Sequence, residues 1–176
     1  MLNHISHNCS SFAYEKNGLY HINRPVTPEE IFTMAKEIIS KSFLRDIHFD
    51  STRVTSNYFM MKLAQYEHEI FCIAFLDNQH RVIACEEMFR GTINNAVIYP
   101  RELVKRALHY NAAALILAHN HPSGFAEPSQ EDKDLTGQLK EILALMDIKI
   151  LDHIVIGGTE AISFADRGLL QPWISE

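Results

Sequence analysis

Two neighbouring segments decide the fold: residues 113–122, AALILAHNHP, and residues 129–132, SQED. The first six residues are an apolar run with the length of a buried strand. The run leads into two histidines, and Pro122 stops a regular strand from continuing because proline has no N–H to donate. The segment therefore predicts a buried strand that delivers polar side chains to a surface, where sites are usually built.

The two histidines are spaced to work together. Alternate residues of an extended chain point to the same side, so His119 and His121 share one space while Asn120 points away. The loop over residues 123–128 is long enough to turn the chain back, so that Asp132 approaches the same point from the next helix. Zinc held by three nitrogen and oxygen ligands keeps a fourth position for water, which is the arrangement of catalytic sites. His119, His121 and Asp132 thus predict a catalytic Zn²⁺ centre and a hydrolase.

The same residues have simpler explanations when each is taken alone. A His-x-His pair is a weak signal, since most such pairs are surface or capping residues. Ser129-x-x-Asp132 is also a capping box, with Ser129 as the cap and Asp132 at the third helical position. We expect that capping geometry in either case, because it places Asp132 at the positive end of the helix. The whole combination, with a buried strand before it and a helix after it, favours a metal site.

A hydrolytic zinc site also needs a base. Metal lowers the pKa of bound water to about 7, and a nearby carboxylate that does not bind the metal can move the proton to the leaving group. Glu67 and Glu69 precede the first core strand, and Glu86 and Glu87 lie on the next strand. Spacing alone does not choose among these four.

The rest of the chain predicts an α/β fold. Thr27-Pro28-Glu29-Glu30 marks the start of a helix that reaches about Phe43. Hairpins and crossovers are mixed, which predicts a mixed β-sheet sandwiched by helices, in a single domain with an N-terminal helical arm. Further helices are expected over 52–66, over 100–110 and from Ser129, and strands over 71–76, 81–89, 95–99, 113–118, 148–156 and 161–164.

The domain organisation follows from these elements. We expect an N-terminal arm and helix over residues 1–50 and the α/β domain over residues 51–176. Residues 1 to about 26 show no period. Their end is expected either to be disordered or to lie along another subunit.

Composition narrows the classes of function. Hydrophobic residues make up 47% and charged residues 22%, which is ordinary for a globular protein. The net charge is −6 and the basic residues are scattered, with the densest cluster over Arg101–Arg106. That pattern disfavours direct, tight nucleic-acid binding.

The setting follows from cysteine usage and hydropathy. The three cysteines have no C-x-x-C spacing and do not suggest a disulfide framework, which favours a reducing, cytoplasmic location. The first twelve residues lack the regions of a signal peptide. The longest purely apolar run, residues 112–118, is far shorter than the roughly 20 residues that span a bilayer. We therefore expect a cytoplasmic protein without a membrane partner.

The motif residues resemble a known family. His119-x-His121-Pro122 followed by Ser129-x-x-Asp132 is similar to the JAMM signature of JAB/MPN metalloproteases. The wider stretch, about residues 52–170, resembles the RadC family of bacteria. The matching segments are FLDNQHR at 75–81, FRGT at 89–92, YPRE at 99–102, AHNHPSG at 118–124 and LDHIVIG at 151–157.

This resemblance implies a JAB/MPN α/β fold with one catalytic zinc. It carries His119, His121 and Asp132 over as metal ligands and Ser129 as the residue that steadies the oxyanion. The family's glutamate just precedes the first core strand, which selects Glu69, with Glu67 second. The implied function is a zinc metallopeptidase or isopeptidase that cleaves a peptide or isopeptide bond by metal-activated water. Its substrate would be a protein or peptide, of an identity that the sequence does not specify.

One family segment contains a further polar pair, Asp152-His153. Neighbours on a strand point to opposite faces, so one of the two can support a ligand histidine by a hydrogen bond. The other interpretation is a buried polar pair satisfied by the backbone. The sequence leaves both open.

Two other functions compete with hydrolysis. Full-length RadC proteins have a helix-hairpin-helix domain ahead of the JAB domain, whereas this chain has about fifty residues there and resembles short RadC-like proteins of prophage and mobile regions. A non-catalytic interaction or accessory module linked to DNA repair or mobile elements is therefore the alternative. Nucleobase deamination ranks last, because its H-x-E and P-C-x-x-C pattern is absent. The oligomeric state, including a homo-oligomer, stays open.

Overall fold

The computed structural model describes residues 12–14, 20–43, 49, 51–91 and 98–170. The chain divides into two compact units, Met1–Phe43 and Leu44–Glu176. The first unit contains β1 (Phe12–Tyr14), β2 (Tyr20–Ile22) and α1 (Pro28–Phe43). The second contains α2 (Thr52–Leu63), β3 (Ile70–Leu76), β4 (Val82–Arg90), α3 (Pro100–His109), β5 (Ala114–Asn120), α4 (Gln130–Ala144), β6 (Lys149–Gly157) and β7 (Glu160–Ser163).

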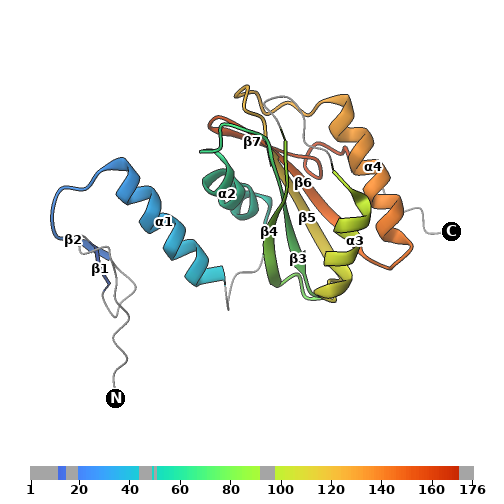
Figure 1. The fold of residues 1–176 in the computed structure, drawn as a ribbon, viewed down its shortest axis with the longest axis horizontal. Helices are drawn as coiled ribbons and strands as arrows, with labels where there is room; N and C mark the ends of the chain where they lie inside the picture. The colour runs from blue at the N-terminus through green and yellow to red at the C-terminus, as the bar shows by residue number, and fades with distance from the viewer. Residues whose placement is uncertain (1–11, 15–19, 44–48, 50, 92–97, 171–176) are drawn as a thin grey trace, which may run out of the picture. The chain divides into compact units, whose positions relative to one another are not determined.

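The second unit is built on a mixed sheet with the strand order β4-β3-β5-β6-β7. Strands β5 and β6 are parallel, and the other neighbours are antiparallel. Parallel strands need a crossover connection, and α4 supplies it between β5 and β6. Helix α2 covers one face of the sheet, and α3 and α4 cover the other (Figure 1). The predicted α/β fold, a mixed sheet sandwiched by helices, is confirmed.

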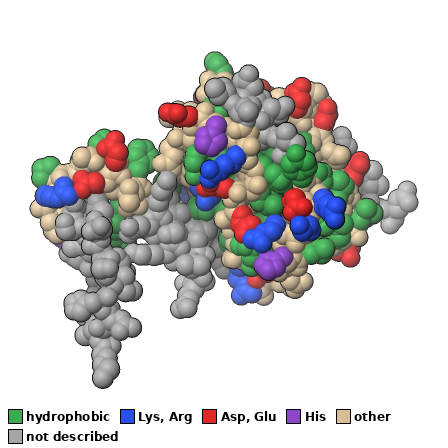
Figure 2. Space-filling model, viewed as in Figure 1, with side chains coloured by type: hydrophobic (Ala, Val, Ile, Leu, Met, Phe, Trp, Pro, Cys, Tyr) green, Lys and Arg blue, Asp and Glu red, His purple; other side chains and the backbone are tan. Residues whose placement is uncertain are grey.

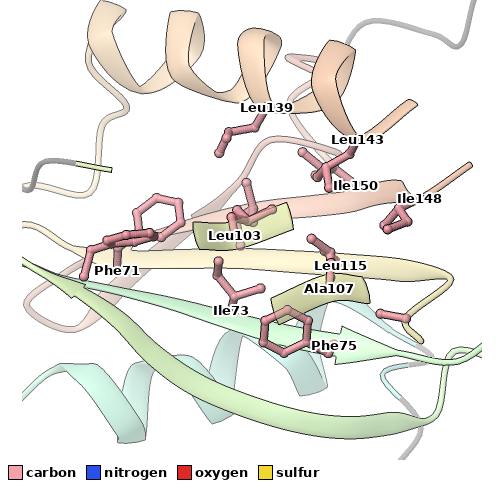
Figure 3. Packing of buried hydrophobic residues seen from close by; sticks show 13 residues of the cluster. Phe71, Ile73, Phe75, Leu103, Ala107, Leu115, Leu139, Leu143, Ile148 and Ile150 are labelled. Carbon is pink, nitrogen blue, oxygen red and sulfur yellow. The ribbon is translucent and has the colours of Figure 1, made fainter. Parts of the chain in front are cut away.

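The main hydrophobic core lies between the sheet and the pair α3 and α4. Leu139 and Leu143 of α4 reach down towards the strands, where Leu115 and Ile150 lie (Figure 3). Every residue of β5 is buried, which explains its almost continuous apolar sequence. The central strand is therefore held rigidly from both faces and both sides.

The register of the sheet brings distant segments together at one edge. His119 near the end of β5 lies opposite Phe71 at the start of β3 and beside Val155 of β6. The residues just before β3 and just after β5 thus meet at the same edge. Segments fifty residues apart in the chain come together there.

The N-terminal unit confirms one prediction and adds an element. The capping box at the start of α1 is present, because Glu30 N–H donates to Thr27 Oγ1 at 3.3 Å and Thr27 N–H donates to Glu30 Oε2 at 3.0 Å. The antiparallel pair β1 and β2 lies in the arm that showed no period in the sequence. Pairs this short leave too few residues for a pattern.

Some expected boundaries were wrong. Helix α2 ends at Leu63 rather than near Tyr66. The strand expected over 95–99 falls mostly outside the described residues, and Ile98 and Tyr99 are not in a strand. Among the described residues, no helix combines the length and hydropathy needed to cross a membrane.

Candidate metal centre

Three residues predicted as metal ligands converge at the edge of the sheet where β5 ends. His119 lies near the end of β5, His121 directly follows the strand, and Asp132 lies in the first turn of α4. Each offers a ligand atom, and all three atoms lie within 4.8 Å of one another. The fold therefore brings together a set that could hold a metal ion.

The spacing of the ligand atoms fits a small cation. His119 Nε2 lies 2.9 Å from His121 Nε2 and 3.1 Å from Asp132 Oδ1, and His121 Nε2 lies 3.4 Å from Asp132 Oδ2. Tetrahedral zinc with bonds of about 2.0–2.2 Å places its ligand atoms roughly 3.3–3.6 Å apart. The observed arrangement is slightly tighter than that, and small movements would open it.

The loop after β5 orients His121. Its Nδ1 lies 2.8 Å from the carbonyl oxygen of Phe125. A carbonyl only accepts, so Nδ1 carries the hydrogen, and the neutral ring has a bare Nε2. Nε2 faces His119 and Asp132 and is the atom left to bind a metal.

The loop itself depends on a glycine that the sequence did not identify as part of the site. A Cβ added at Gly157 would lie 2.3 Å from the backbone nitrogen of Ala126. Only glycine allows the loop to pack so closely on the end of β6. The next residue, Gly158, has a φ of +58° and begins the turn to β7, whereas Gly157 lies against the loop that positions His121.

The capping box predicted at α4 is confirmed and fixes Asp132. Asp132 N–H donates to Ser129 Oγ at 3.1 Å, while Asp132 Oδ2 accepts from Ser129 N–H at 2.8 Å and from the Ser129 hydroxyl at 2.7 Å. Burial would raise the pKa of Asp132, but its close contacts with His119 and His121 and its hydrogen bonds from Ser129 hold that pKa well below its usual range. The carboxylate is therefore ionised and directed at the two rings.

His119 is held from behind by a second histidine. Its ring is 1% exposed, lies parallel to Phe71 with 5.9 Å between ring centroids, and places Nδ1 2.9 Å from His153 Nε2. Burial lowers the pKa of His153, so the His153 ring is neutral. His153 Nδ1 in turn lies 2.6 Å from Thr136 Oγ1.

Asp152 and His153 on β6 have different partners, so each fits one of the two interpretations given by the sequence. His153 supports His119, whereas Asp152 points to the other side and accepts from His153 N–H, Ala165 N–H and the Ser163 hydroxyl. Asp152 therefore ties β6 to the end of β7 and to the turn that follows it. Thr136 was missed in the sequence, although it lies four residues after Asp132 and so on the same helix face.

Among the four candidate glutamates, Glu69 is the one best placed to act as the base. It is half-buried immediately before β3. Burial raises its pKa, and the charges of His119, Asp132 and His121 all act on it. Glu67 is exposed instead.

The other two candidate bases are engaged elsewhere. Glu86 accepts from Arg106 and Tyr110 of the α3 region. Glu87 accepts from the Tyr66 hydroxyl at 2.9 Å and pairs with Lys62 at 3.4 Å. The geometry therefore favours Glu69 among the four.

Asn120, on the other face of β5, holds the segment that contains Glu69. Its Oδ1 accepts from Ile70 N–H at 2.8 Å, and its Nδ2 donates to the carbonyls of His68 at 3.0 Å and Tyr66 at 3.2 Å. The sequence indicated that Asn120 points away from the histidines, and the structure shows what it holds. Strand β5 thus positions the two histidines and the segment of the candidate base.

Comparison with known proteins identifies the family. Residues 49–169 match the RadC-like JAB domain. The chain belongs to the RadC-like JAB domain family. The resemblance to the RadC family is thereby confirmed. His119, His121 and Asp132 lie within the matched region.

Several curated relatives are about 50% identical to the chain over the residues that align. A UPF0758 protein of Vibrio cholerae is 49% identical over 86% of this chain and 95% of its own length. UPF0758 proteins of Methylibium petroleiphilum and Nitrosococcus oceani are 51% and 58% identical, over 80% and 67% of this chain. The matched regions span only 63% and 53% of those two relatives, so activities of the longer proteins do not transfer directly.

Proposed function

We propose that this protein is a zinc-dependent hydrolase of the JAMM type that cleaves a peptide or isopeptide bond. The observation that carries the proposal is the convergence of His119, His121 and Asp132, with Glu69 beside them. The donor set contains imidazole nitrogen and carboxylate oxygen without thiolate, as in catalytic zinc sites. When bound, zinc would polarise the scissile carbonyl and lower the pKa of a water molecule.

Glu69 is the proposed proton carrier. As general base it would accept a proton from the attacking water, and as general acid it would then protonate the leaving amine. Burial raises the pKa of this carboxyl, which brings proton uptake and release closer to neutral pH. Asn120 would keep the Glu69 segment in place during both transfers.

Ser129 is the proposed second donor to the oxyanion. Its hydroxyl donates to Asp132 Oδ2 in this structure, while its backbone N–H donates to the same oxygen. Rotation of the hydroxyl towards the substrate would free a hydrogen for the developing charge, and the N–H would still hold Asp132.

The surface supports a protein or peptide substrate over nucleic acid. Charged side chains of both signs are interspersed on the face shown in Figure 2. In the basic cluster of α3, Lys105 pairs with Glu102 at 2.9 Å, and Arg106 pairs with Glu86. A cytoplasmic location remains part of the proposal.

The test compares two neighbouring glutamates. Glu69→Gln should keep the metal and abolish hydrolysis, whereas the exposed Glu67→Gln should leave both unchanged. The substrates would be a peptide library that includes lysine isopeptides, analysed by mass spectrometry, and metal content would be measured on the same samples. The Glu69→Gln protein would also serve to trap a substrate from host lysate.

The control outcomes separate the alternatives. Unchanged turnover in Glu69→Gln would remove Glu69 as the base. Salt-dependent DNA binding without hydrolysis of any peptide by the wild type would favour the accessory-module function instead.

A further inference from the structure

A line of buried contacts runs behind the candidate metal centre. His119 Nδ1 lies 2.9 Å from His153 Nε2, His153 Nδ1 lies 2.6 Å from Thr136 Oγ1, and Thr136 Oγ1 lies 2.6 Å from the carbonyl oxygen of Asp132. All three side chains are buried. The line therefore links one candidate ligand, His119, to the backbone of another, Asp132.

The chemistry of the end group sets the direction of every hydrogen in the line. The Asp132 carbonyl only accepts, and two oxygen atoms at 2.6 Å repel unless a hydrogen lies between them. The single hydroxyl hydrogen of Thr136 must therefore point to Asp132. Thr136 Oγ1 is then left to accept from His153 Nδ1–H.

The hydrogen position on His153 determines the hydrogen position on His119. A neutral His153 with its hydrogen on Nδ1 has a bare Nε2, which accepts from His119 Nδ1–H. His119 then keeps a free lone pair on Nε2, the atom that faces Asp132 at 3.1 Å. The reverse direction would place a hydrogen on that atom and leave the contact between Thr136 and Asp132 with none.

We propose that Thr136 and His153 are positioning residues that set His119 in the Nδ1–H tautomer and thereby make Nε2 a metal ligand before the metal arrives. The inference rests on the proposed metal site and deepens it. His121 is held through Nδ1–H by the Phe125 carbonyl, and its Nε2 lies 2.9 Å from His119 Nε2. The hydrogen that this contact requires lies on His121, and binding of a metal would release it.

The test removes the hydroxyl while keeping the shape of the side chain. In Thr136→Val, the N–H at His153 Nδ1 loses its acceptor. A buried N–H without a partner costs more free energy than a buried ring nitrogen that has only an unused lone pair. His153 should change to the Nε2–H tautomer and drive His119 to the same form. Thr136→Ser should retain the wild-type state.

A matched control exists on α2. Thr55 is also buried, and its hydroxyl also donates to the carbonyl four residues earlier, that of Ser51, at 3.0 Å. Thr55→Val should lower stability in a similar way without any effect on the histidines. A merely structural role for Thr136 would make the two variants behave alike.

Two readouts decide the outcome. In chelated full-length protein at roughly pH 8, above the ordinary histidine pKa of about 6.5, ¹⁵N NMR should show His119 as Nδ1–H in the wild type and as Nε2–H in Thr136→Val. Zinc affinity, measured by competition, should fall about 10- to 100-fold in Thr136→Val and stay unchanged in Thr136→Ser and Thr55→Val.

The contrary results are equally specific. A wild-type His119 with its hydrogen on Nε2 would overturn the inference, as would a Thr136→Val protein that keeps both the wild-type tautomer and the wild-type affinity. A wild-type protein with the Nδ1–H tautomer but no affinity for zinc would overturn the proposed function, while the assignment of the tautomer would stand.

Discussion

The surroundings of His119 and His121 differ although the two rings face the same point. His119 lies within β5, is 1% exposed, and is held by Phe71 and by the His153 side chain. His121 is 20% exposed and is held by a carbonyl of the loop that follows the strand. One candidate ligand thus belongs to the core and the other to a loop.

This difference gives the two histidines different freedom to move. The core histidine has a fixed position and tautomer, because its supports are packed side chains. The loop histidine can adjust by small loop movements when a cation enters a group that is tighter than zinc geometry. Predictions that perturb one side at a time can break or sharpen this comparison.

The largest expected effect is on stability when His119 is removed. In metal-free protein, His119→Ala should lower the free energy of unfolding by about 3 kcal/mol, since it leaves a cavity beside Phe71 and an unsatisfied nitrogen on His153. His121→Ala should cost under about 1 kcal/mol, because its ring is partly exposed. Denaturant unfolding with chelator present measures both. Equal losses in the two variants would contradict the core-and-loop distinction.

An intermediate effect is expected from the loop support. In Gly157→Ala the new Cβ overlaps the backbone at Ala126, so the loop must shift and draw the Phe125 carbonyl away from His121. Zinc affinity should then fall about 10-fold, in line with the loss of an outer hydrogen bond. Competition titration of the folded variant measures this change.

The matched control for that substitution is Gly137→Ala. Gly137 lies within α4, and a Cβ there would meet nothing within 4 Å. It should leave zinc affinity unchanged and stabilise the helix by roughly 0.5–1 kcal/mol. A Gly157→Ala protein with the affinity of Gly137→Ala would show that the loop does not orient His121.

The smallest expected effect concerns pH in the metal-free protein. The pKa of His121 is raised, chiefly by its hydrogen bond to Asp132. The pair therefore stabilises the fold fully below the ordinary histidine pKa of about 6.5. This stabilisation is lost as the pH rises through the raised pKa of His121. The pKa of His153 is lowered by burial, so its contribution has the opposite sign and stability is lost as pH falls below about 6.5.

The two signs can be separated by one variant. In chelated His121→Ala, the loss of thermal stability from pH 8 down to pH 5 should be steeper than in the wild type, because only the His153 effect remains of the two. Thermal unfolding across that range measures the slopes. A shallower slope in His121→Ala would mean that the His121–Asp132 pair does not contribute as described.

The sequence predicted the parts of this molecule that depend on local chemistry. The apolar run of β5 predicted a buried central strand, the His-x-His spacing predicted two rings on one side, and Ser129-x-x-Asp132 predicted the capping box that aims the carboxylate. Each follows from the geometry of a single strand or helix end.

The supports of the site could not be predicted in the same way. Asn120 holds the Glu69 segment, and Gly157 allows the loop to approach, only because of how β3, β5 and β6 are paired. No local pattern specifies such a register between distant segments. Thr136 is the exception, because its spacing from Asp132 placed it on the right face of α4.

Metal content is the most direct test of the central claim that this edge of the sheet is a zinc centre. The full-length protein should be purified without added zinc and its transition metals measured per chain, beside His119→Ala prepared identically. The account predicts about one zinc per wild-type chain, by the one-ion arrangement of such sites, and little or none in His119→Ala. A wild-type protein without stoichiometric transition metal, or a His119→Ala protein with the same content as the wild type, would contradict it.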